Sequence, residues 1–160
     1  MATTYADLSA NSRVWVYQSN KELEQNAVEQ LKLQVDDFTK EWASHNVQLK
    51  AWGDILHNRF VVFMVDESQA GASGCSIDKS VAFIKNIETN LGVDMFDRWN
   101  FAYKNGDKVE AADRDDFVQL YNNGQITDET TVFNNLVTTK DDFEQKWQVK
   151  LSDSWHKRLL

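Results

Sequence analysis

The stretch from Val65 to Val81, VDESQAGASGCSIDKSV, holds the densest set of residues in this chain that could do chemistry. It places two carboxylates, a glycine-rich loop and the chain's only cysteine after an apolar run and before an amphipathic stretch. Such a loop presents backbone amides at a helix start, where the helix dipole favours a carboxylate or phosphate. We therefore predict a binding site for a small anion or a protein partner. Its predicted ligand-binding residues here are Asp66, Glu67, Ser68, Gly71, Ser73, Gly74 and Lys79.

The same loop has a purely structural alternative. Asp78 lies in the first turn of the expected helix and would answer the helix dipole from within the protein. The glycine-rich segment would then be a loop in front of a self-capped helix.

A different class of function, a small hydrolase or transferase, would use Cys75 or Ser76 as the nucleophile. A thiol at a helix start ionises more readily than a free thiol, and loop amides can stabilise a developing oxyanion. The acidic residues around Cys75 oppose this effect, and a small buried cysteine is the structural alternative. Such a nucleophile needs a base. The candidates are His45, His57 and His156, which the sequence alone does not place.

The segment VVFMVDES is similar to a Walker B element, in which an aspartate supports magnesium and a glutamate orients water. ATP hydrolysis of this type also needs the phosphate-binding pattern G-x-x-x-x-G-K-S/T. No match exists, since Gly71 and Gly74 lie three residues apart and Lys79 follows five residues after Gly74. The sequence therefore argues against an ATPase. It gives no metal-ligand spacing, identifies no cofactor, and leaves open a divalent ion near Asp66 and Glu67.

Composition narrows the remaining possibilities. A formal net charge of −8 opposes binding to nucleic acid or to an anionic membrane, because their phosphates would be repelled. One cysteine excludes an internal disulfide. No apolar run approaches the ~20 residues of a membrane-spanning helix, and the start of the chain does not resemble a secretory signal. We expect a cytoplasmic protein whose partner is a small anionic molecule or another protein.

Hydrophobic periodicity predicts the elements of the first half of the chain. A strand at 13–19 is followed by a helix that opens with the capping-box pattern Ser19-x-x-Glu22. A hairpin follows, whose strands begin at Val47 and span 59–65 and whose turn is near His57-Asn58. A second helix starts near Ser76 and ends at Gly92.

The second half predicts another hairpin around Asn105-Gly106, which is the residue pair of a type I′ turn. Asp113 is expected to cap a short helix, and a possible edge strand follows near 130–137. Thr139 is expected to cap a last helix. The apolar stripe of that helix is predicted to be Phe143, Trp147, Leu151 and Trp155.

The order of these elements predicts one α+β domain spanning residues 1–160. It matches a split-βαβ, ferredoxin-like sheet of four to six strands with helices on one face, plus a C-terminal helical extension. We expect the strands at 13–19 and 59–65 to be parallel neighbours. Their exits would then share one sheet edge, which adds Ser19 and Asn20 to the predicted ligand-binding residues.

Three segments of the chain, VDESQAGASGCSIDKSV, VFNNLV and SWHKR, resemble a family of small uncharacterised bacterial proteins. Members are sometimes labelled ABC transporter ATPases. The motifs do not support that label, because a Walker A and an L-S-G-G-Q signature are absent. The loosely similar GASGCS follows the Walker-B-like strand instead of preceding it. Since the family has no known activity, the resemblance implies no site residues.

Overall fold

Strand β5 (Phe60–Asp66) lies at the centre of the computed structural model, which describes residues 3–160. All of its residues are buried. It pairs antiparallel with β1 (Arg13–Gln18) on one side and β4 (Lys50–Leu56) on the other. A strand buried on both faces explains why the sequence RFVVFMV is almost continuously apolar.

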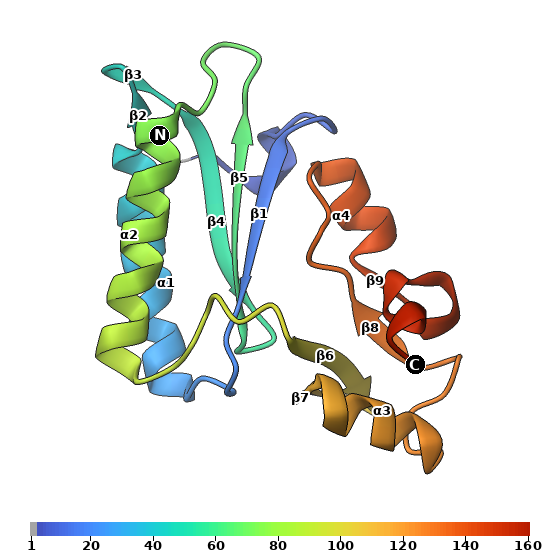
Figure 1. The fold of residues 1–160 in the computed structure, drawn as a ribbon. Coiled ribbons are helices and arrows are strands. Elements are labelled where there is room, and N and C mark those ends of the chain that lie inside the picture. The colour runs from blue at the N-terminus through green and yellow to red at the C-terminus, as the bar shows by residue number, and fades with distance from the viewer. Residues whose placement is uncertain (1–2) are drawn as a thin grey trace.

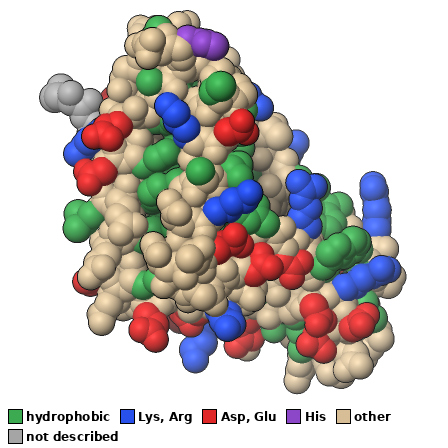
Figure 2. Space-filling model, turned by 60° about the vertical axis from the view of Figure 1, so that its left-hand side comes forward, with side chains coloured by type: hydrophobic (Ala, Val, Ile, Leu, Met, Phe, Trp, Pro, Cys, Tyr) green, Lys and Arg blue, Asp and Glu red, His purple; other side chains and the backbone are tan. Residues whose placement is uncertain are grey.

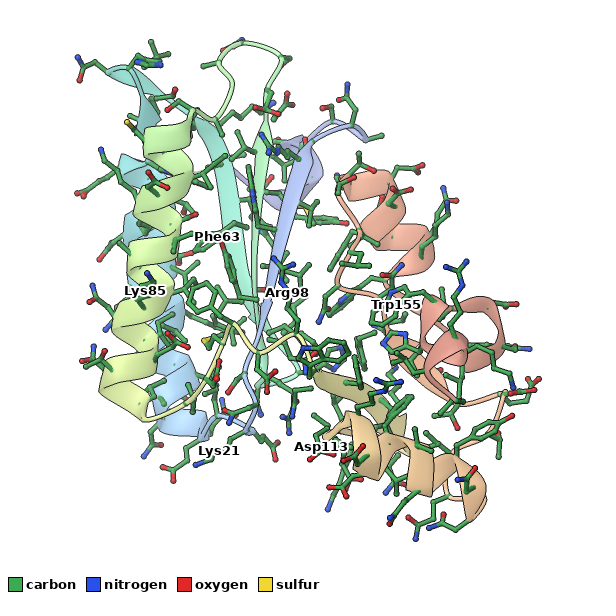
Figure 3. All side chains as sticks on the ribbon, in the orientation of Figure 1. Lys21, Phe63, Lys85, Arg98, Asp113 and Trp155 are labelled. Atoms are coloured by element: carbon green, nitrogen blue, oxygen red, sulfur yellow. The ribbon has the colours of Figure 1, made fainter. Side chains whose placement is uncertain are left out.

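Helices α1 (Gln25–Glu41) and α2 (Gly74–Leu91) cover one face of this sheet (Figure 1). Strand side chains alternate between faces, so Val61, Phe63 and Val65 point toward these helices and join their hydrophobic core. Phe63 is fully buried there and lies between the sheet and the helices (Figure 3). Gly53 on β4 makes room for it, because an added Cβ would lie 2.9 Å from the Phe63 ring.

The opposite face of the sheet packs against the second half of the chain (Figure 1). Phe60, Val62 and Met64 share a hydrophobic core with Phe133 and Trp147. This half contains a four-stranded antiparallel sheet in the order β7-β6-β8-β9. Its strands and helices are β6 (Asn100–Asn105), β7 (Lys108–Asp113), α3 (Arg114–Asn122), β8 (Thr131–Phe133), α4 (Lys140–Lys146) and β9 (Gln148–Lys150).

Short elements complete the chain. A two-stranded ribbon, β2 (Ala43–Ser44) and β3 (Val47–Gln48), follows α1. Single 3-10 turns lie at both ends of the described residues: η1 (Tyr5–Asp7), η2 (Leu151–Asp153) and η3 (Trp155–Leu159).

Several sequence predictions are confirmed. The chain is α+β, and β4 and β5 form a hairpin whose turn residues His57 and Asn58 both have positive φ. Gly92 ends α2 in the left-handed conformation, with φ of 65°. Asp113 and Thr139 cap α3 and α4 by accepting hydrogen bonds from backbone amides.

The predicted pairing of the first and third strands is wrong in direction. β1 and β5 are neighbours, but Arg13 pairs with Val65 and Gln18 with Phe60, so the strands are antiparallel. The tight β4–β5 hairpin reverses the chain, and β4 runs in the same direction as β1, which leaves β5 antiparallel to both. The strands also divide into separate sheets of three, two and four strands instead of one sheet of four to six.

The predicted capping box at Ser19 is also wrong, since α1 begins at Gln25. The backbone amides of Ser19 and Leu23 donate to carbonyls of the β4–β5 turn, at Arg59 and Asn58. These bonds hold 19–23 as an extended crossing segment, so the helix starts later.

Other differences lie in the second half of the chain. β8 lies between β6 and β9 and is therefore not an edge strand. The last predicted helix stops at Lys146, and the chain then forms β9, η2 and η3 in place of a helical extension. Asn105 pairs with Lys108, so the hairpin turn is Gly106-Asp107 and only Gly106 has positive φ, which excludes type I′.

The surface of the face that carries α1 and α2 mixes acidic and basic side chains (Figure 2). Within residues 3–160, none of the helices has the length and apolar composition needed to cross a membrane.

Candidate functional site

Three amides of the glycine-rich loop are occupied by the protein's own side chains. Ala72 N–H donates to Glu67 Oε2 at 2.8 Å, and Ser73 N–H donates to Ser76 Oγ at 2.6 Å. Ser76 N–H in turn donates to Ser73 Oγ at 3.2 Å. The structural alternative therefore describes this helix start, with Ser73 and Ser76 as the capping residues instead of Asp78. These three donors are not open to a ligand, and an anion site at the remaining amides of the loop stays a prediction.

Asp66, the last residue of β5, is hydrogen-bonded to the N-terminal segment. Its buried carboxylate accepts the backbone N–H groups of Ser9 at 3.2 Å and Ser68 at 3.1 Å, and Lys50 Nζ lies 3.5 Å away. Hydrogen bonds from Ser68 and Ser9, aided by the charge of Lys50, hold the pKa of Asp66 well below its usual range. Such contacts give Asp66 a structural role. Among the described residues, no group of three or more His, Cys, Asp or Glu side chains is arranged to hold a metal ion.

Asp66 should therefore make stability depend on acidic pH. Its folded-state pKa is lowered from 3.8, so its contribution is fully present above that value and is lost as the pH falls below it. We expect Asp66→Asn to lower the free energy of unfolding at pH 7, with the difference from wild type shrinking below pH ~4. Urea unfolding at several pH values measures this. A difference that stays constant from pH 7 to pH 3 would contradict the assignment.

The proposed nucleophiles lack catalytic partners in the structure. Ser76 is buried, and its Oγ donates to Ser73 O at 2.8 Å as part of the cap. Cys75 is exposed rather than buried, and no hydrogen bond joins it to a histidine of the described chain. Lys79 and Gly74 are exposed at the same helix end. The enzyme alternative stays a prediction without a base in place.

Ser19 and Asn20 lie at the opposite end of the sheet from Asp66, because β1 and β5 are antiparallel. The structure therefore does not bring the two predicted parts of the site together. Asn20 instead pins the segment after α2: its N–H donates to Asp94 O and its Oδ1 accepts Asp94 N–H, at 2.9 and 2.8 Å.

That pinned segment forms one wall of a cleft of about 340 Å³ between the two larger sheets, which we call the inter-sheet cleft. The other walls come from β1, the residues around the end of β8, and η3. Its lining is mainly apolar and aromatic. The principal apolar side chains are Tyr17, Phe96, Phe101, Phe133, Leu136 and Trp155.

Local hydrogen bonds shape the wall that carries Arg98. Asp94 Oδ1 accepts the N–H groups of Phe96 and Asp97, and Asp97 Oδ1 accepts Trp99 N–H. Asp side chains commonly bond to backbone two residues on, which fixes a turn without a helix or strand. Arg98 therefore lies on a loop whose shape is fixed by these bonds. Figure 3 shows Arg98 beside β1 and Trp155 on the C-terminal part of the chain.

Arg98 is the unpaired cation of the inter-sheet cleft. Its side chain is exposed and, within residues 3–160, makes no ion pair or hydrogen bond. A guanidinium presents a planar fork of N–H donors that matches a carboxylate. Asp97 also lines the cleft, but one of its oxygens is already used by Trp99 N–H.

Amide side chains form the polar part of the cleft wall. Gln18 Nε2 donates to Asn100 O and Oδ1, and Asn135 Nδ2 donates to Gln18 Oε1 at 2.8 Å. Trp147 Nε1 then donates to Asn135 Oδ1 at 2.9 Å. Because these side chains fill one another's hydrogen bonds, they link β1 to the second half of the chain and fix the position of the cleft wall.

His156 lines the same cleft with only 1% of its surface exposed. Its ring stacks on Trp155 with 3.8 Å between centroids, and Nδ1 lies 2.6 Å from Ser154 Oγ. Burial lowers the pKa of His156 to about 4, so the ring is neutral at pH 7.

A second hollow, of about 560 Å³, lies between α1 and β4. Its amide Gln48 donates to the carbonyls of Trp42 and Leu49, both at 3.0 Å. Asp36 and Lys40 line the same hollow with opposite charges. Since Trp52 is the one aromatic residue in its lining, it lacks the aromatic walls of the inter-sheet cleft and is the weaker candidate.

Sequence reasoning missed the inter-sheet cleft. The segment DMFDRWNFAY does carry a signal, because Arg98 stands between Phe96 and Trp99, two large apolar residues that prove to be exposed. The hairpin interpretation treated this segment as the lead into a strand. The remaining walls come from β1 and η3, which no sequence spacing connects to it.

Comparison of the chain with protein-family models, with curated proteins and with solved structures finds no match. The resemblance to the small uncharacterised bacterial proteins therefore stays a prediction, and the functional argument depends on the geometry of the inter-sheet cleft.

Proposed function

We propose that this chain is a cytoplasmic binding domain for a small organic anion, held in the inter-sheet cleft. The observation that carries the proposal is the combination of Arg98, which has no partner in the described chain, with aromatic and aliphatic walls. Small-molecule sites are usually concave, mainly apolar, and equipped with few polar groups. The glycine-rich loop gives weaker support for the same role, because the amides of Ala72, Ser73 and Ser76 are already bonded.

The cleft favours an organic anion over an inorganic one. Its apolar walls gain from covering a hydrocarbon part of the ligand, while Arg98 pairs with the charge. Asp97 beside Arg98 lowers the local positive potential, which disfavours a dianion such as phosphate. The exposed thiol of Cys75 is compatible with the reducing conditions of a cytoplasm.

The test is calorimetric titration of the purified chain with hexanoate, benzoate, inorganic phosphate and neutral hexanamide. We expect at least one of the two carboxylates to bind, and hexanamide and phosphate to bind more weakly. Arg98→Gln should weaken carboxylate binding by about 10- to 100-fold, as expected for loss of a charged hydrogen bond.

Arg114→Gln is the matched control, because Arg114 is exposed at the start of α3 and does not line the cleft. It should leave binding unchanged. Binding of neither carboxylate, or equal losses in the two variants, would refute the proposed function.

A further inference from the structure

Aromatic residues line two walls of the inter-sheet cleft. Phe96 lies on the segment after α2, and its ring meets Tyr17 edge-to-face with 5.8 Å between ring centroids. Tyr17 itself points toward α1 and α2, where its ring lies 6.3 Å from that of Phe63, so it supports Phe96 from behind. On the other wall, Phe101 meets Trp155 edge-to-face at 5.8 Å. An aromatic ring between Phe96 and Trp155 would add aromatic contacts that a saturated ring or chain cannot make.

Phe96 is accessible while it lines the cleft, since 38% of its surface is exposed. Leu136, on the opposite rim, is 67% exposed. Large apolar side chains left open at the rim of a polar-edged pocket are characteristic of a surface that a ligand covers. A flat apolar ligand that covered Phe96 and Leu136 would lie in the cleft that Arg98 also lines.

His156 supplies a separate observation that points to a ligand. Ser154 Oγ accepts His156 N–H at 3.5 Å and lies 2.6 Å from Nδ1, a contact whose direction depends on the ring tautomer. When the Ser154 hydroxyl donates to Nδ1, the proton of the neutral ring lies on Nε2, which has no partner in residues 3–160. Nε2 is not among the fully enclosed unpartnered atoms of that range, and His156 lines the cleft, so we infer that Nε2–H is available to a ligand there.

We propose that the ligand of the inter-sheet cleft is an aromatic carboxylate, whose ring lies between Phe96 and Trp155 and whose carboxylate pairs with Arg98. A ligand acceptor atom takes the Nε2–H of His156. This inference rests on the proposed function and narrows it from organic anions in general to those with a planar conjugated ring. A carboxylate conjugated to such a ring keeps its plane, which suits both the guanidinium fork and the flat space.

The experiment compares benzoate with one acid that differs in the ring and with one neutral compound that keeps the ring. Full-length protein is titrated with benzoate, with cyclohexanecarboxylate, and with neutral benzyl alcohol, while amide and indole NMR signals are followed. We expect benzoate to bind at least about fivefold more tightly than cyclohexanecarboxylate, since an aromatic pair adds ~1 kcal/mol beyond burial. Benzyl alcohol should bind more weakly than either acid.

Two test variants, together with one control, separate the contribution of the Phe96 ring to binding from that of His156. Phe96→Leu keeps an apolar rim and should reduce the preference for benzoate over cyclohexanecarboxylate. Phe83→Leu is the matched control, because Phe83 packs against Phe38 and Phe63 on the helix side of the sheet and does not line the cleft, and it should leave the preference unchanged. Ser154→Ala frees the His156 tautomer and should weaken benzoate binding several-fold without changing the Arg98 dependence.

The outcomes distinguish the two proposals. Equal binding of benzoate and cyclohexanecarboxylate, both lost in Arg98→Gln, would overturn the aromatic inference and leave the organic-anion function standing. No binding of either acid would overturn both.

Discussion

Replacing Phe63 with alanine is expected to lower the free energy of unfolding by about 3–5 kcal/mol. Phe63 is fully buried in the core between β5 and the helices α1 and α2. Its ring lies 5.3 Å from Phe38, 5.6 Å from Trp42 and 6.0 Å from Phe83, between centroids. The rigid sheet and two helices prevent the site from collapsing, so the variant keeps most of the cavity. Urea unfolding followed by tryptophan fluorescence measures the loss.

Two controls show whether the loss comes from the core. Phe63→Leu keeps much of the buried volume and should cost less than the alanine variant. Leu33→Ala removes a side chain that is 67% exposed and should change stability by no more than about 0.5 kcal/mol. A loss below ~1 kcal/mol for Phe63→Ala would mean that β5 is not enclosed by α1 and α2.

Replacing Trp147 with alanine is expected to affect both stability and the inter-sheet cleft. Trp147 is buried, and its ring lies 4.9 Å from Phe60 and 5.0 Å from Phe133, which joins β5 to β8. Loss of the ring should cost about 3–5 kcal/mol. Asn135 also loses the indole N–H that holds its side chain, so the wall of the cleft loosens and carboxylate binding weakens.

Trp147→Phe separates these effects, because it keeps an aromatic ring but removes the donor to Asn135 Oδ1. It should cost less stability than Trp147→Ala while still weakening the carboxylate binding that depends on Arg98. Unfolding curves and calorimetric titration are measured on the same samples. Unchanged binding in a folded Trp147→Phe protein would show that the amide network does not support the cleft.

Local patterns in the sequence predicted most elements of the first half of the chain. The alternation around β4, the apolar run of β5 and the positive-φ residue Gly92 each depend on neighbours within a few positions. The direction of β1 relative to β5 follows from two elements that the sequence did predict: a helix that returns the chain to a strand parallel to β1, and a tight hairpin that reverses it. The parallel prediction did not take the hairpin into account. The wrong direction then placed Ser19 and Asn20 at the wrong end of the sheet.

The predicted helix at the C-terminal end was wrong for a related reason, since its outcome depends on distant parts of the chain. A period of four from Phe143 to Trp155 is typical of a helix, but Trp147 packs against Phe60 and Phe133, and Val149 pairs with Val132. These tertiary contacts override the helical pattern after Lys146.

For the candidate site, too, local features were predicted and the long-range ones were not. The sequence located a helix start with serine hydroxyls beside its amides, and Ser73 and Ser76 do bond to amides there. Whether side chains or a ligand fill those bonds depends on rotamers that spacing does not fix. The inter-sheet cleft joins residues from β1 to η3, so it exists only once both sheets are assembled.

A crystal structure of the protein soaked with benzoate would show directly whether the inter-sheet cleft is the binding site. We expect density for one benzoate in the inter-sheet cleft, with its carboxylate within hydrogen-bonding distance of the Arg98 guanidinium and its ring between Phe96 and Trp155. Benzoate bound at the Ser73–Ser76 amides, or an empty cleft at a concentration that saturates binding in solution, would contradict this expectation.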